Sequence, residues 1–197
     1  MASRRKRCLT VLVGKQGYGK SSYMKWLLFN LLKKMPREKF VIYDTDGDET
    51  FDPIPISFKV PKRYNRIIRL SSGRVSYSSA LEFASRLGGC SLFFPDASFH
   101  ENSRLSEPLK SKLYTLRHLN LDLYMGFHNN WRIPIELMAQ FTYIVKFYEG
   151  VTLAPKFERL EVYPEMKEFW ERFENAQKGA KGKEKYKSLL FSRESPK

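Results

Sequence analysis

One short segment near the amino terminus constrains the fold of this chain more than any other. Residues 14–21 read GKQGYGKS and match the spacing G-x-x-x-x-G-K-S of a phosphate-binding loop. The apolar run 8–13 leads directly into this segment, and an amphipathic stretch with helical spacing follows it. A strand, a glycine-rich turn and a helix in this order favour a nucleotide site over a turn that only caps a helix.

The residue types in this segment suit a triphosphate. Glycines let consecutive backbone N–H groups turn toward the β-phosphate, and the helix that follows adds the partial positive charge of its amino terminus. We expect Lys20 to span the β- and γ-phosphates and the Ser21 hydroxyl to complete the inner shell of a Mg²⁺ ion. The residues predicted to bind ATP are Gly14, Lys15, Gln16, Gly17, Tyr18, Gly19, Lys20, Ser21 and Ser22.

Length and composition fit one domain with a sizeable core, since 42% of the 197 residues are hydrophobic. No apolar run approaches the roughly 20 residues of a membrane-spanning helix, and the basic start of the chain leads into the phosphate loop. Cys8 and Cys90 are the two cysteines, and both lie in apolar runs. These features predict a cytoplasmic protein without disulfides and without a transmembrane segment.

The net charge of +14 is concentrated at the two ends. Residues 1–7 contain four Lys or Arg and no acid, and residues 178–197 contain seven against two acids. We therefore divide the chain into a basic arm at 1–7, a nucleotide-binding domain at 8–177 and a flexible basic tail at 178–197. Basic ends suit contacts with the phosphates of DNA, although solvated ends that only raise solubility have the same composition.

Apolar periodicity predicts strands that alternate with helices, which is typical of an α/β three-layer sandwich with a mostly parallel sheet. Ligands of such sheets bind at the carboxyl ends of the strands. The predicted strands are 8–13, 40–43, 67–70, 90–94, 121–127 and 142–148. The predicted helices are 21–34, 77–87, 105–119, 134–140 and 164–177.

Hydrolysis of a bound nucleotide needs an acid delivered by a second strand. Asp96, directly after the strand 90–94, is the acid placed in this way. Where many hydrolases have Asp and then Glu, this chain has Pro95-Asp96-Ala97, so one acid is missing. Either Asp96 holds Mg²⁺ through water and Ala97 replaces the catalytic glutamate, or Pro95 replaces the metal acid and Asp96 activates water.

Several further polar residues are candidates for the site. Asp44 or Glu101 could supply the missing carboxylate, although for Glu101 a solvated surface position is expected. His128 or Asn129, at the end of the next strand, could contact the γ-phosphate or the attacking water, or belong to an ordinary turn. Arg117 could stabilise charge on the phosphoryl group of a neighbouring subunit, or simply favour its own helix dipole.

Four segments carry a resemblance: the phosphate loop 14–21, YDTDGDE at 43–49, LFFPDA at 92–97, and 116–129 with its arginine, strand and polar end. Together they resemble the FtsK/HerA superfamily of P-loop ATPases, including viral or mobile-element packaging ATPases and Zot-like proteins. His128 stands where that family commonly has Gln, and the second acid is absent.

The resemblance implies an additional-strand P-loop fold, a homo-oligomeric ring that is usually hexameric, and ATP-driven movement of DNA or, in some branches, protein export. It implies a capsid or secretion protein as a further partner, and association with the virion if the source is viral. Two other functions remain open: a non-catalytic assembly or secretion factor gated by nucleotide, and a small-molecule or nucleotide kinase. A GTPase is disfavoured because the sequence has no Asn-Lys-x-Asp segment.

Overall fold

The computed structural model describes residues 8–45, 51, 66–87, 89–101, 104–180, 184 and 187–193. Its seven strands form one sheet in the order β3-β2-β4-β5-β1-β6-β7. All neighbouring pairs are parallel except β6 and β7, which are antiparallel. The elements are β1 (Leu9–Val13), α1 (Lys20–Lys34), β2 (Lys39–Asp44), β3 (Ile67–Ser71), α2 (Tyr77–Arg86), β4 (Cys90–Phe94), α3 (Glu107–Leu113), α4 (Leu116–Leu119), β5 (Leu121–Phe127), α5 (Ile135–Gln140), β6 (Tyr143–Lys146), α6 (Tyr163–Gln177) and β7 (Leu189–Ser192).

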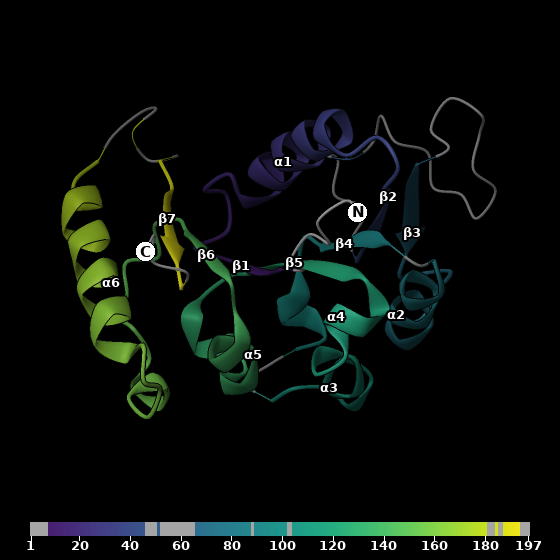
Figure 1. Ribbon diagram of the computed structural model, residues 1–197. Helices are drawn as coiled ribbons and strands as arrows, with labels where there is room; N and C mark the ends of the chain where they lie inside the picture. The colour runs from purple at the N-terminus through teal and green to yellow at the C-terminus, as the bar shows by residue number, and fades with distance from the viewer. Residues whose placement is uncertain are drawn as a thin grey trace.

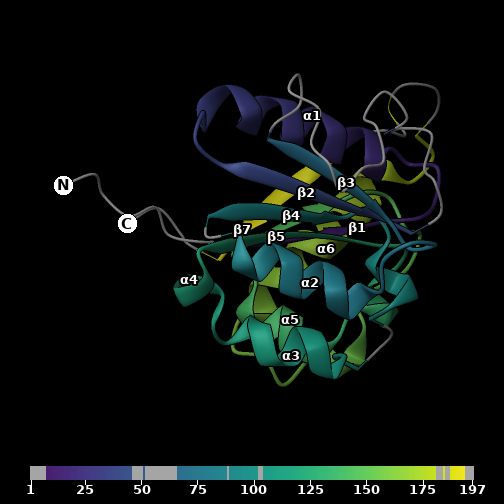
Figure 2. The same cartoon turned by 90° about the vertical axis from the view of Figure 1, so that its right-hand side faces the viewer.

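Helices cover both faces of this sheet, as the sequence predicts for strands that are apolar on both sides. Helix α1 lies over one face, and α2, α3 and α5 lie over the other (Figures 1 and 2). Successive side chains of β1 point to opposite faces: Leu12 packs in the cluster with Met24 of α1, whereas Val11 and Val13 belong to the larger cluster on the other face. The predicted three-layer α/β sandwich is confirmed.

The position of β5 decides where the polar segments meet. This strand lies between the phosphate-loop strand β1 and β4, and it pairs with both in parallel. Val13 is opposite Phe127, and Phe94 is opposite Met125, so the three strands end at the same edge of the sheet. The sheet is therefore of the additional-strand type, and the segments after β1, β4 and β5 are neighbours.

The predicted flexible tail at 178–197 is wrong for residues 189–192, which form a strand. Strand β7 pairs with β6 at the edge of the sheet, and Phe191 packs against Phe141 and Phe169 with ring centroids 5.9 and 5.1 Å apart. The apolar run that begins at Leu189 thus pairs with β6 and packs against hydrophobic side chains. The predicted basic arm at 1–7, the acid-rich residues 46–49 and much of the tail lie outside the described residues.

The single helix predicted at 105–119 is two short helices in the structure, α3 and α4. The Thr115 hydroxyl donates to the carbonyl groups of Ser111 and Lys112, at 3.4 and 3.1 Å. Side chains such as threonine compete with the helical backbone hydrogen bonds in this way. The interruption at Thr115 turns the chain toward the start of β5.

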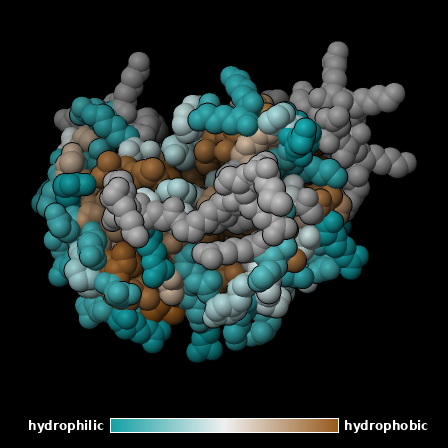
Figure 3. Space-filling model, in the orientation of Figure 1, coloured by the Kyte–Doolittle hydropathy of each residue, from teal (hydrophilic) through white to brown (hydrophobic). Residues whose placement is uncertain are grey.

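On the face seen in Figure 3, hydrophilic residues predominate, and hydrophobic residues show between them. Within the described ranges, none of the helices combines the length and the apolar character that crossing a membrane requires.

Candidate nucleotide site

The phosphate loop presents free amide groups to a cavity. Gly19 has a φ of 89° and occupies the N-cap position of α1, a left-handed conformation that suits glycine. The N–H groups of Lys20, Ser21 and Ser22 lie in the first turn and lack intrahelical partners. Within the described part of the chain, no side-chain hydrogen bond caps the amino terminus of this helix. A 15-residue helix that starts in this way favours an anion at its amino terminus.

Backbone contacts hold the start of the loop in place. The Gly14 N–H donates to the Phe127 carbonyl at 3.1 Å, and the Lys15 N–H donates to the Tyr148 carbonyl at 2.9 Å. A Cβ on Gly14 would lie 2.5 Å from the Cβ of Phe147, so only glycine fits there. The loop is therefore shaped before any ligand arrives, which lowers the ordering cost of binding.

Lys20 lies beneath the loop with its ammonium group largely withdrawn from water. Its Nζ donates to the carbonyl groups of Gly14 at 2.6 Å and Lys15 at 3.1 Å, and the residue is 6% exposed. Burial lowers the pKa of Lys20 from 10.5 to about 8, against the opposing charges of Asp96 and Glu149. A triphosphate would supply the negative charge that this desolvated group lacks.

This lowered pKa predicts proton uptake when ATP binds. At pH 8 about half of the free protein carries a neutral Lys20, since the pKa lies at about 8. The phosphates favour the ammonium form and raise the pKa, so we expect binding to take up about half a proton at this pH. Calorimetry in buffers of different ionisation enthalpy measures this uptake. An uptake that stays constant between about pH 7 and pH 9 would contradict the prediction.

Asp96 and His128 form a pair at the carboxyl ends of β4 and β5. The His128 Nε2 lies 3.0 Å from one carboxylate oxygen of Asp96, and the Ser98 N–H donates to the other at 3.1 Å. The backbone N–H of His128 in turn donates to the Ser98 hydroxyl at 3.1 Å. Burial alone would raise the pKa of Asp96, but the bonds from His128 and Ser98 bring it below its ordinary value. The carboxylate is therefore ionised at neutral pH.

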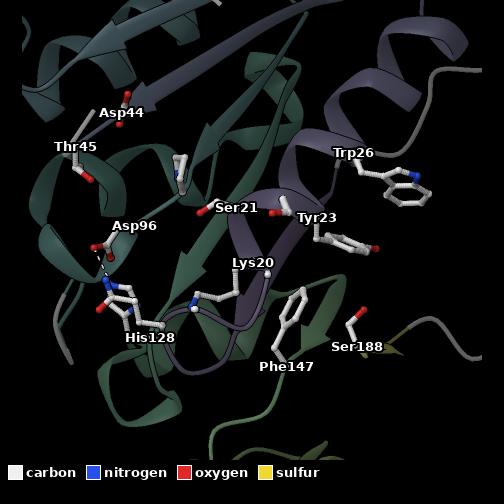
Figure 4. A pocket seen from close by; sticks show the side chains of 15 residues that line it. Lys20, Ser21, Tyr23, Trp26, Asp44, Thr45, Asp96, His128, Phe147 and Ser188 are labelled. Atoms are coloured by element: carbon white, nitrogen blue, oxygen red, sulfur yellow. Dashed lines mark hydrogen bonds and ion pairs between the residues drawn. The ribbon is translucent and has the colours of Figure 1, made fainter. Parts of the chain in front are cut away.

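One cavity of about 860 Å³ joins these parts. In Figure 4, Lys20 lies between the Asp96–His128 pair on one side and a group of aromatic side chains on the other. The structure thus brings together most of the residues that the sequence predicts for the site. The lining residues are Gln16, Gly17, Gly19, Lys20, Ser21, Ser22, Tyr23, Trp26, Asp44, Thr45, Pro95, Asp96, His128, Phe147 and Ser188.

Some predicted site residues do not line this cavity. Gly14 and Lys15 act through their carbonyl groups on Lys20, and the Tyr18 ring packs 5.5 Å from that of Tyr148. The contact with Lys20 and the ring packing give these loop residues a supporting position.

Two further predictions fall outside the cavity of this chain. The Asn129 side chain accepts a hydrogen bond from the Arg132 N–H at 3.1 Å and caps a short helical turn. Arg117 lies on α4, which precedes β5 and therefore lies at the opposite edge of the sheet from the phosphate loop. The role predicted for Arg117 is at the site of a neighbouring subunit, and it stays a prediction.

The two alternative acids are both buried in other contacts. Asp44 lines the cavity, but its carboxylate accepts hydrogen bonds from Arg69 Nε at 2.9 Å and Nη2 at 2.5 Å. Glu101 is fully buried and accepts from the Tyr77 hydroxyl and the Ser106 N–H, both at 2.7 Å. Burial raises the pKa of Glu101, although these hydrogen bonds oppose the rise. The predicted solvated position of Glu101 is wrong, because local hydrogen bonds satisfy it inside the fold.

The sequence reasoning missed a buried ionic cluster beside the loop. Lys146 Nζ lies 2.9 Å from Glu149, 2.6 Å from Glu174 and 3.9 Å above the Trp170 ring. Glu149 also accepts from the Asn130 N–H at 2.6 Å, and burial raises its pKa against the charge of Lys146. The cluster fastens the segment after β5 to α6. The signal for it in the sequence was a lysine, Lys146, at the end of the otherwise apolar strand β6.

Gly126 fixes the distance between β5 and the turn that carries Asp96. A Cβ at this position would lie 2.2 Å from the Pro95 carbonyl oxygen, so the backbone must shift. We expect Gly126→Ala to lower stability by about 1–3 kcal/mol and to reduce ATP turnover by moving Asp96. Denaturant unfolding and steady-state kinetics measure both effects. Gly73→Ala is the control, because its nearest contact would be a serine hydroxyl at 3.7 Å; equal behaviour of the two variants would contradict this view.

No protein-family model matches the sequence, and a search of curated proteins finds no match. Solved structures with a similar fold exist, however. The genome packaging NTPase B204 from Sulfolobus turreted icosahedral virus 2, in complex with sulfate, has a TM-score of 0.69 and 19% identity, covering 96% of this chain and 93% of that one.

Two further solved structures share the fold. B204 of Sulfolobus turreted icosahedral virus, described as a DNA-packaging ATPase, has a TM-score of 0.64 and 17% identity over 94% of this chain and 92% of that one. The N-terminal domain of zonular occludens toxin from Neisseria meningitidis has a TM-score of 0.51 and 14% identity over 74% and 78%. The chain therefore has the P-loop NTPase fold that a viral packaging NTPase and the zonular occludens toxin domain share, as the resemblance in the sequence predicts.

Proposed function

We propose that this chain is an ATP-hydrolysing motor that moves DNA during packaging of a viral or mobile-element genome. One observation carries the proposal: the phosphate loop and the Asp96–His128 pair face the same cavity. The fold around this cavity matches B204 over nearly the whole chain, and B204 has also been solved in complex with ATP-gammaS. The proposed site of action is the cytoplasm or the virion.

The residues around the loop fit a magnesium–triphosphate ligand. The amide groups of the loop and the Lys20 ammonium would neutralise the phosphates, and the Ser21 hydroxyl would bind Mg²⁺. No cluster of three or more potential metal-ligating side chains occurs in the described ranges, which fits an ion held mainly by phosphate oxygens and water. The bound ion would neutralise charge that develops on the phosphoryl oxygens.

The cavity lining supports one of the two roles open to Asp96. Pro95 and Asp96 face the cavity, whereas Ala97 is fully buried and does not line it. This arrangement favours Asp96 as the residue that activates water, with Pro95 in place of the metal acid. In this role the Asp96 carboxylate accepts a proton from water as the water oxygen bonds the γ-phosphorus and ADP leaves. His128 holds the carboxylate in position and would lie beside the γ-phosphate.

We further propose that several copies form a ring. No arginine lines the cavity among the described residues, so a cation for the transition state would come from a neighbouring copy. Arg117 is the candidate that the resemblance suggests. The basic segments at 1–7 and 178–197 would contact DNA phosphates, and a capsid or secretion protein would be a further partner.

The main alternative is a nucleotide-gated assembly factor that does not turn over ATP. The incomplete acid pair favours this alternative, because Pro95 stands where a metal-binding carboxylate would be. Turnover separates the two functions, since an assembly factor needs binding only.

The test measures ATP hydrolysis with and without duplex DNA as salt is raised. We expect hydrolysis that duplex DNA stimulates at low salt, and stimulation that falls steeply as salt rises, because DNA binding releases counterions. Lys20→Ala supplies the background rate. Assembled rings whose hydrolysis ignores DNA at low salt would contradict the motor. Tight ATP binding with hydrolysis at the background rate would favour the assembly factor.

A further inference from the structure

The cavity continues past the phosphate loop to an aromatic end that the phosphates do not need. Tyr23 and Trp26 come from α1, Phe147 follows β6, and Ser188 precedes β7. In Figure 4 these four side chains lie on the opposite side of Lys20 from Asp96 and His128. We call the three aromatic side chains, those of Tyr23, Trp26 and Phe147, the aromatic wall.

The members of the aromatic wall contact one another. The ring centroids of Tyr23 and Trp26 are 5.3 Å apart at 42°, and those of Tyr23 and Phe147 are 5.8 Å apart at 78°. Tyr23 is partly buried against the core beneath α1, whereas Trp26 remains 57% exposed. The aromatic wall therefore contains a ring held by the core, Tyr23, and one large π-surface that is still accessible, Trp26.

The direction of a bound nucleotide follows from the rest of the site. If the γ-phosphate lies by Asp96 and His128, the sugar and base must leave the loop on the other side of Lys20. Trp26 lies six residues after Lys20, which places it about 9 Å further along the helix axis. The part of the ligand that arrives there is a flat aromatic ring, and aromatic side chains stack on nucleobases.

We infer that the aromatic wall is the nucleobase site, with Trp26 as the stacking surface and the Ser188 hydroxyl beside the base edge. The inference rests on the proposed function to the extent that a triphosphate occupies the loop. A hydroxyl both donates and accepts hydrogen bonds, so Ser188 suits the polar edge of a base. Because Ser188 immediately precedes β7, the base would also contact the segment that carries the edge strand.

A tryptophan on a helix surface is common, so its exposure alone would not single out a site. Phe29 provides the comparison within the same helix. It is also an exposed aromatic residue, at 41%, but it does not line the cavity. The two residues thus separate loss of an exposed aromatic ring on α1 from loss of the cavity wall.

The experiment compares Mg·ATP with tripolyphosphate, which has the phosphates but no base, by titration calorimetry. We expect Trp26→Ala to weaken ATP binding about tenfold, or about 1.4 kcal/mol, and to leave tripolyphosphate binding within about twofold. Trp26→Phe should recover most of the loss, because a smaller aromatic ring still stacks. Phe29→Ala should bind both ligands like the unaltered protein.

The outcomes distinguish this inference from the proposed function. Equal weakening of ATP and tripolyphosphate by Trp26→Ala would overturn stacking and indicate a distorted loop. Unchanged ATP binding in Trp26→Ala, or equal losses in Phe29→Ala, would also overturn it. If the unaltered protein binds neither ligand, the phosphate site itself is wrong, and so is the proposed function.

Discussion

Replacing Lys20 by alanine is expected to weaken ATP binding at least tenfold, by about 1.4 kcal/mol or more. The ammonium group is 6% exposed and lies under the loop, where it bonds the carbonyl groups of Gly14 and Lys15. A charge in such a desolvated position interacts with phosphates more strongly than a charge in water. Titration calorimetry with Mg·ATP measures the loss.

Loss of the fold would not explain this result. Burial lowers the pKa of Lys20 to about 8, so the ammonium form, although it still predominates at neutral pH, is less favourable in the folded protein than in water. The alanine variant is therefore expected to keep the melting temperature. Lys33→Ala, an equal change of charge in the last turn of the same helix, serves as the control and should bind ATP normally. Normal ATP binding and turnover in Lys20→Ala would refute the assignment of the site.

The second large effect is expected for Asp96→Asn. An amide keeps the size of the side chain and an oxygen that can accept from Ser98, but it cannot take a proton from water at neutral pH. We expect kcat to fall about 100-fold or more, while the Kd for ATP changes less than about threefold, or 0.7 kcal/mol. Steady-state kinetics and calorimetry separate the two quantities.

Glu168→Gln on the exposed face of α6 is the control for the same chemical change. Full turnover in Asp96→Asn would show that the acid comes from elsewhere. Asp44 would then be the next candidate, because it lines the cavity and could act if its bond to Arg69 were released.

The parts of the fold that depend on local pattern could be predicted from the sequence. The loop 14–21 predicts the strand before it and the helix after it, since glycines and a lysine at this spacing between a strand and a helix are typical of a phosphate-binding loop. The buried strands β1, β4 and β5 are continuous apolar runs, which parallel sheets with two covered faces produce. Asp96 and His128 could each be placed at a strand end for the same reason.

The contact between Asp96 and His128 could not be predicted from either strand alone. It depends on β5 lying beside β4, and the order of strands in a sheet is a property of the whole fold. Strand β7 was missed because four residues within a lysine-rich stretch give little periodic signal. Its stability comes from pairing with β6 and from packing against distant side chains.

The burial of charged side chains was the other feature that the sequence analysis did not predict. Glutamate and lysine are usually exposed, but they can be buried where residues distant in the sequence supply hydrogen-bond or ion-pair partners. Glu101 is satisfied by Tyr77 and Ser106, and Lys146 by two glutamates. These partners are brought close by the fold, so the sequence around each residue does not reveal them.

The most direct test of this account is the crystal structure of the protein with Mg²⁺ and a nonhydrolysable ATP analogue. We expect the triphosphate to lie against the amide groups of Lys20, Ser21 and Ser22, and the Lys20 Nζ to leave the Gly14 carbonyl for the phosphates. An analogue bound elsewhere, or an empty loop in which Lys20 still bonds Gly14 at saturating analogue, would contradict the account.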